Sequence, residues 1–199
     1  MPDESIQELR RTAELSGTRE DRQAYYAALK RAGTLDYPDL VRDLDDHGVL
    51  RDLTGSGFRG RILRPWEDHG ERVPYPLKPE ALAQIQVIAL DGDGGIVCRW
   101  SGGASDGVPV VFLGSEGEAA VIAQDATEFF LLLGYDCSFY DLSAPQVPLL
   151  DPIPELLSRL EQVLGRDLGG DPRGAVERAR ASNTDFSSWL ESSWAIALG

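Results

Sequence analysis

The chain has 199 residues, enough for one sizeable hydrophobic core, and 42% of them are hydrophobic, which excludes wholesale disorder. Its formal net charge of −14 argues against nucleic acid or anionic lipid as a direct ligand. No run of about 18 apolar residues is present, and the N-terminus is acidic where a signal peptide would be basic. We therefore expect a cytoplasmic protein that contacts no membrane.

Residues 1–33 predict two helices. Leu9 and Ala13 follow a helical spacing in the first. Thr18, with Asp21 three residues later, resembles a capping box that opens the second, and Gly33 is a natural stop.

A third, short helix is predicted from Pro38 to the residues before Gly48. Its apolar stripe consists of Leu40, Val41 and Leu44. Three aspartates are expected on its solvent side: Asp43, Asp45 and Asp46.

Residues 53–79 are punctuated by glycine and proline and predict a long loop with one short strand around Ile62 and Leu63. Trp66 lies in this loop, and we expect its indole to be exposed and available as a binding anchor. For Trp100 and Trp189 we expect a place in the core.

An antiparallel sheet is predicted in the middle of the chain, from the β-type runs at 85–90, 96–100, 108–113 and 119–123. Asp and Gly residues at 91–95 and a Gly-rich turn at 114–117 join two pairs of these runs into hairpins. Asp125, with Glu128 three residues on, then predicts a helix that ends at Gly134.

The C-terminal part predicts two further helices. One starts at Pro154 and is broken by the stretch 165–174, and a final amphipathic helix runs from Thr184 to Leu198.

Charge is segregated along the chain, because residues 79–158 contain twelve carboxylates and a single cation, Arg99. An acidic, ordered surface attracts basic proteins. The candidate partner-binding residues are mainly carboxylates at strand ends: Asp91, Asp93, Asp106, Glu116 and Glu118, with Trp66 as an aromatic anchor. The alternative is that this charge only maintains solubility.

No catalytic, metal or cofactor site is predicted. Residues 91–95 are acidic but fail the calcium-loop pattern, because its twelfth position falls on Gly102. His47 and His69, the only histidines, lack zinc-ligand spacing. Cys98 and Cys137 are expected to be free core thiols, and a small hydrolase using one of them with a histidine is the least favoured alternative.

Four segments in this order resemble the SUKH superfamily: 88–94 (IALDGDG), 108–113 (VPVVFL), 121–123 (VIA) and 128–134 (EFFLLLG). The resemblance covers about residues 85–135, and Phe186 to Trp189 is similar to the late F-x-x-W element of some bacterial members. The family's entry motif has no clear counterpart here.

The resemblance implies an α+β fold with a single antiparallel sheet and helices packed against it. We therefore expect one domain over residues 1–199, with a SUKH-like core at about 34–142 and helical extensions at 1–33 and 145–199. Many bacterial members are immunity proteins that neutralise toxins, often nucleases, and others are regulatory or scaffold proteins. We thus expect a non-catalytic protein that binds a basic toxin domain, or alternatively a housekeeping interaction module without a toxin partner.

Overall fold

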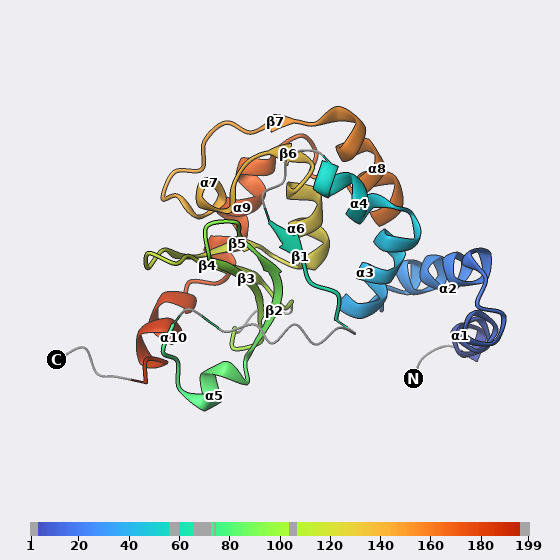
Figure 1. The fold of residues 1–199 in the computed structure, drawn as a ribbon, viewed down its shortest axis with the longest axis horizontal. Coiled ribbons are helices and arrows are strands. Elements are labelled where there is room, and N and C mark those ends of the chain that lie inside the picture. The colour runs from blue at the N-terminus through green and yellow to red at the C-terminus, as the bar shows by residue number, and fades with distance from the viewer. Residues whose placement is uncertain (1–3, 56–59, 66–72, 74, 104–106, 196–199) are drawn as a thin grey trace.

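A five-stranded antiparallel sheet lies at the centre of the computed structural model of this chain (Figure 1). The structure describes residues 4–55, 60–65, 73, 75–103 and 107–195. The sheet has the order β1-β2-β3-β4-β5, and its strands are β1 (Arg61–Ile62), β2 (Ile85–Leu90), β3 (Ile96–Trp100), β4 (Val110–Leu113) and β5 (Ala119–Ala123). A small second sheet pairs β6 (Tyr135–Asp136) with β7 (Asp151–Pro152).

Helices surround this sheet, and the predicted α+β class is confirmed. The helices before β2 are α1 (Glu4–Ser16), α2 (Arg19–Ala32), α3 (Tyr37–Asp46), α4 (Val49–Gly55) and α5 (Pro79–Leu82). Those after β5 are α6 (Ala126–Leu132), α7 (Phe139–Ser143), α8 (Pro154–Leu164), α9 (Pro172–Ser182) and α10 (Phe186–Ser192). None of the described helices is long and apolar enough to cross a membrane.

Two tight turns give the sheet its neighbour-to-neighbour order. Leu90 pairs with Ile96 across the first turn, and Leu113 pairs with Ala119 across the second. Gly94 and Gly117 have φ values of 92° and 106° in these turns, a region that residues with a Cβ rarely adopt. Both predicted hairpins are confirmed.

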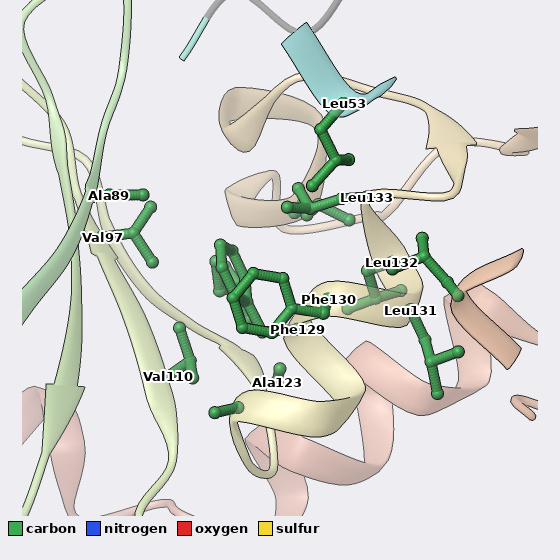
Figure 2. Close-up of a cluster of buried hydrophobic side chains, with 14 of the residues drawn as sticks. Leu53, Ala89, Val97, Val110, Ala123, Phe129, Phe130, Leu131, Leu132 and Leu133 are labelled. Carbon is green, nitrogen blue, oxygen red and sulfur yellow. The ribbon is translucent and has the colours of Figure 1, made fainter. Parts of the chain in front are cut away.

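Alternate residues of a strand point to opposite faces of the sheet. In this sheet both faces carry apolar residues. Val97 and Phe112 belong to the larger core, in which Figure 2 shows Phe129 and Phe130 of α6 directed toward the sheet. The neighbours in sequence of these strand residues, such as Cys98, face the smaller core instead. Helices can therefore pack on either side of the sheet.

The smaller core attaches α10 to the sheet through aromatic rings. The ring centroid of Trp100 lies 5.1 Å from that of Phe186 and 5.2 Å from that of Trp189. Trp100 is fully buried and Trp189 is half-buried, with its indole N–H donating to Gln84 Oε1 at 2.7 Å. The predicted core roles of both tryptophans are confirmed.

Local capping signals set the helix ends. The side chain of Thr18 accepts a hydrogen bond from the Asp21 amide at 3.2 Å, and Asp125 accepts one from the Glu128 amide at 2.8 Å. The predicted starts of α2 and α6 are therefore confirmed, as is the start of α8 at Pro154.

Several predictions were wrong in detail. Helix α9 occupies residues 172–182, between the two helices predicted in the helical extension 145–199, and it packs against β5. Its Arg180 donates to the carbonyl oxygens of Val121 at 3.2 Å and Ala144 at 2.8 Å, so α9 is firmly joined to the body. Asp43 was expected in solvent, but its carboxylate is buried and ion-paired with Lys30.

The last helix is shorter than predicted. It begins at Phe186, after Asp185 and not Thr184, and ends at Ser192. Beyond it, Trp194 packs on Tyr75 with ring centroids 5.3 Å apart, so the chain end still packs back on the body as expected.

Candidate protein-binding surface at the acidic end of the sheet

Two acidic turns meet at one end of the sheet. The turn at residues 91–95 joins β2 to β3, and the turn at 114–118 joins β4 to β5. In an antiparallel meander, alternate connections lie at the same end. The turns carry four carboxylates, which we call the acidic end: Asp91, Asp93, Glu116 and Glu118.

The first turn is held by its own backbone. Asp91 N–H donates to Gly95 O at 2.8 Å, and Asp91 Oδ2 accepts from Asp93 N–H at 3.0 Å. A Cβ on Gly95 would come within 2.7 Å of the Phe112 ring, so the turn sits directly on the core. Asp93 is exposed, and Asp91 is half-buried.

The second turn is closed by a hydrogen bond of 2.7 Å from Gly114 N–H to Glu118 O. The same carbonyl oxygen accepts a bond of 2.8 Å from the Tyr75 hydroxyl. Burial raises the pKa of Tyr75 to about 12, so this hydroxyl keeps its proton at neutral pH. Glu116 is exposed at the tip of the turn, whereas Glu118 is half-buried.

A direct contact fixes the two turns to each other. Ser115 Oγ donates to the carbonyl oxygen of Asp93 at 2.9 Å, and it lies 3.5 Å from the Tyr140 hydroxyl of α7. The Tyr140 ring packs edge-on against Phe112, with centroids 5.1 Å apart. The acidic end is therefore anchored to the core and to α7.

The acidic end carries more negative than positive charge. Within the described part of the chain, none of its four carboxylates forms an ion pair. Arg61 of β1 pairs in register with Leu90, next to Asp91, whereas Arg99 pairs with Val110, toward the opposite end of β3 and β4. The Arg99 guanidinium lies 5.2 Å from the Tyr37 ring centroid and donates to Gln86. A negative potential therefore extends from these turns into solvent.

The structure brings together four of the six candidate residues. The other two, Asp106 and Trp66, lie outside the described residues. Sequence reasoning missed Ser115, Tyr75 and Tyr140, which position the turns. A serine inside a Gly-rich turn was the one available signal for Ser115, because side chains there often bond to nearby backbone.

The two cysteines are free and poorly suited to nucleophilic chemistry. Burial raises the pKa of the Cys98 thiol well above its usual range. Burial, helped by Asp141 and Asp136, raises the pKa of Cys137 to about 12. Both thiols are therefore protonated at neutral pH, which disfavours the cysteine-hydrolase alternative. Within the residues that the structure describes, no group of His, Cys, Asp or Glu side chains could hold a metal ion.

No family model, curated protein or solved structure matches this chain. The resemblance to the SUKH superfamily thus stays a prediction from the short motifs.

Proposed function

We propose that this chain is a non-catalytic, cytoplasmic protein-binding domain whose acidic end binds a basic protein. The observation that carries the proposal is the pairing of two acidic turns by the bond between Ser115 and Asp93. Turns that are already ordered lose little conformational entropy on binding, and unpaired carboxylates speed the encounter with a basic surface.

The partner class that we favour is a toxin domain, and a nuclease in particular. A nuclease must hold a polyanionic substrate in a basic cleft, which an acidic protein can occupy. The resemblance to immunity-type SUKH proteins also favours a toxin as the partner. In this role the chain would block the toxin by covering its cleft.

A housekeeping scaffold role is the second candidate. It would use the same acidic end, or leave it as a solubility feature, and it would involve no toxin. The gene neighbourhood separates the two candidates, because an adjacent toxin gene favours immunity and a lone gene favours the scaffold role.

The test is neutralisation in cells by co-expression. A basic protein captured with this chain is first expressed alone, and we expect it to arrest growth. Co-expression of the wild-type chain should restore growth, whereas a D93K/E116K variant should not. A captured partner that is harmless when expressed alone would contradict the toxin assignment and favour the scaffold role.

A further inference from the structure

A pocket lined by cationic side chains lies between α2, α3 and α8. Its volume is about 390 Å³. The lining includes three cations, one imidazole and two amides: Arg19, Lys30, Arg159, His47, Gln23 and Gln162. Such a concentration of positive charge is unexpected in a chain with a net charge of −14.

The carboxylate in the pocket wall, Asp43, is already paired with a cation. The Asp43 side chain is only 1% exposed and forms an ion pair with Lys30, whose ammonium also donates to the carbonyl oxygen of Val163. His47 Nδ1 lies 2.8 Å from Asp43 O and 3.2 Å from Asp43 Oδ1. Asp43 is therefore committed to holding Lys30 and His47 in place.

Two guanidinium groups lie beside Gly48, at the end of α3. A Cβ on this glycine would come 3.4 Å from Arg51 Nη2 and 3.9 Å from Arg159 Nη2. Arg159 donates to His47 O at 2.6 Å and pairs with Asp52. Within the described residues, neither Arg51 nor Arg19 forms an ion pair. Asp52 already serves as the counterion of Arg159, so among the described residues the guanidiniums near the pocket that keep an unpaired charge are those of Arg19 and Arg51.

We propose that this pocket binds a small ligand through a phosphate group. The planar guanidinium fork matches phosphate oxygens, and the amides of Gln23 and Gln162 supply further donors. The volume falls within the range of roughly 300–1,000 Å³ that is usual for small-molecule sites. The negative charge of the rest of the chain disfavours long polyanions, so the ligand is a small molecule and not a nucleic acid.

The test is an NMR titration of the full chain with inorganic phosphate, against chloride at matched ionic strength. We expect saturable amide shifts around residues 47 and 48 with phosphate and none with chloride. A parallel titration with glycerol phosphate identifies the source, because tighter binding assigns an organic phosphate and equal binding assigns the free anion.

Two variants and a control locate the site. Arg19→Gln and Arg159→Gln should each weaken phosphate binding by roughly tenfold, since each removes a charged donor. Arg19 is exposed, so its variant should fold normally. The control is Arg173→Gln on α9, which removes an exposed partner of Glu177 and should change nothing. The proposal is overturned if phosphate gives no saturable shifts, or if all three variants bind it as the wild type does.

Discussion

Ser115 donates a hydrogen bond of 2.9 Å to the carbonyl oxygen of Asp93, so the turns of two separate hairpins are in direct contact. The donor and the acceptor are 22 residues apart in sequence, and both lie on the acidic end. This bond holds the two acidic turns next to each other.

We predict that Ser115→Ala loosens the acidic end without unfolding the protein. Loss of one exposed hydrogen bond should lower the free energy of unfolding by about 0.5–1 kcal/mol. Amide hydrogen exchange should become faster in residues 91–95 and 114–118. Ser187→Ala, at an exposed position of α10, is the matched control. Unchanged exchange in both turns would show that the bond does not order them.

A second prediction concerns the ion pair of Asp43 with Lys30. Asp43→Asn leaves the Lys30 ammonium, whose side chain is 23% exposed, without its counterion. The free energy of unfolding should fall by about 2–3 kcal/mol, near the lower end for a broken buried pair. Chemical denaturation measures this difference.

The control for this change lies on the same helix. Asp45 pairs with Arg64 at 3.1 Å, but its side chain is 41% exposed. Asp45→Asn should therefore cost no more than about 1 kcal/mol. Equal effects of the two substitutions would contradict a structural role for the buried pair.

From the buried carboxyl group of Glu128 we predict that the free energy of unfolding depends on pH. Burial raises its pKa in the folded protein above the ordinary value of 4.5, although its carboxylate accepts a bond of 2.5 Å from Gln124 N–H. The stability associated with a raised pKa is full below pH about 4.5 and is lost as pH rises through the folded value. Wild type should therefore lose stability relative to Glu128→Gln between pH about 4.5 and neutrality.

Denaturation curves at a series of pH values measure that difference. A difference between wild type and Glu128→Gln that stays constant with pH would contradict the assignment.

The two thiols should react slowly in the native protein. Cys98 is fully buried and Cys137 has a pKa of about 12, so iodoacetamide at neutral pH should label neither at the rate of a free thiol. In denaturant both should label rapidly. Fast labelling of either thiol in the native protein would contradict this prediction and favour the hydrolase alternative.

Much of the fold could be predicted because its signals are local. The hairpin turns depend on Asp and Gly residues, and the starts of α2 and α6 on capping side chains. Helix α9 has local start signals, with Asp171 as its N-cap and Pro172 in its first turn, but they lie in the stretch 165–174 that was expected to break the helices. Its buried face consists mainly of small residues that pack on β5.

The misplacement of Asp43 has a different cause. Position 43 lies three residues after Leu40 and next to Leu44, so helical spacing alone puts it on the buried face. Its charge favours the solvent side, because a carboxylate is rarely buried without a partner. A partner from α2, Lys30, makes the burial possible, and no local pattern reveals that partner.

The candidate site was predictable only in part. Four of its carboxylates follow from the hairpin turns, and an antiparallel meander places both turns at one end. The contacts of Ser115 with Asp93 and Tyr140 depend on long-range packing, so the sequence pattern does not contain them.

A pull-down from a lysate of the source cells, with three forms of the chain at low and high salt, tests the central claim most directly. The forms are the wild type, D93K/E116K, and a control E20K/E191K that makes the same change of charge at exposed positions of α2 and α10. We predict that wild type and control retain the same basic protein at low salt and release it as salt rises, whereas D93K/E116K does not retain it. Equal retention by all three forms, independent of salt, would contradict a role for the acidic end in binding.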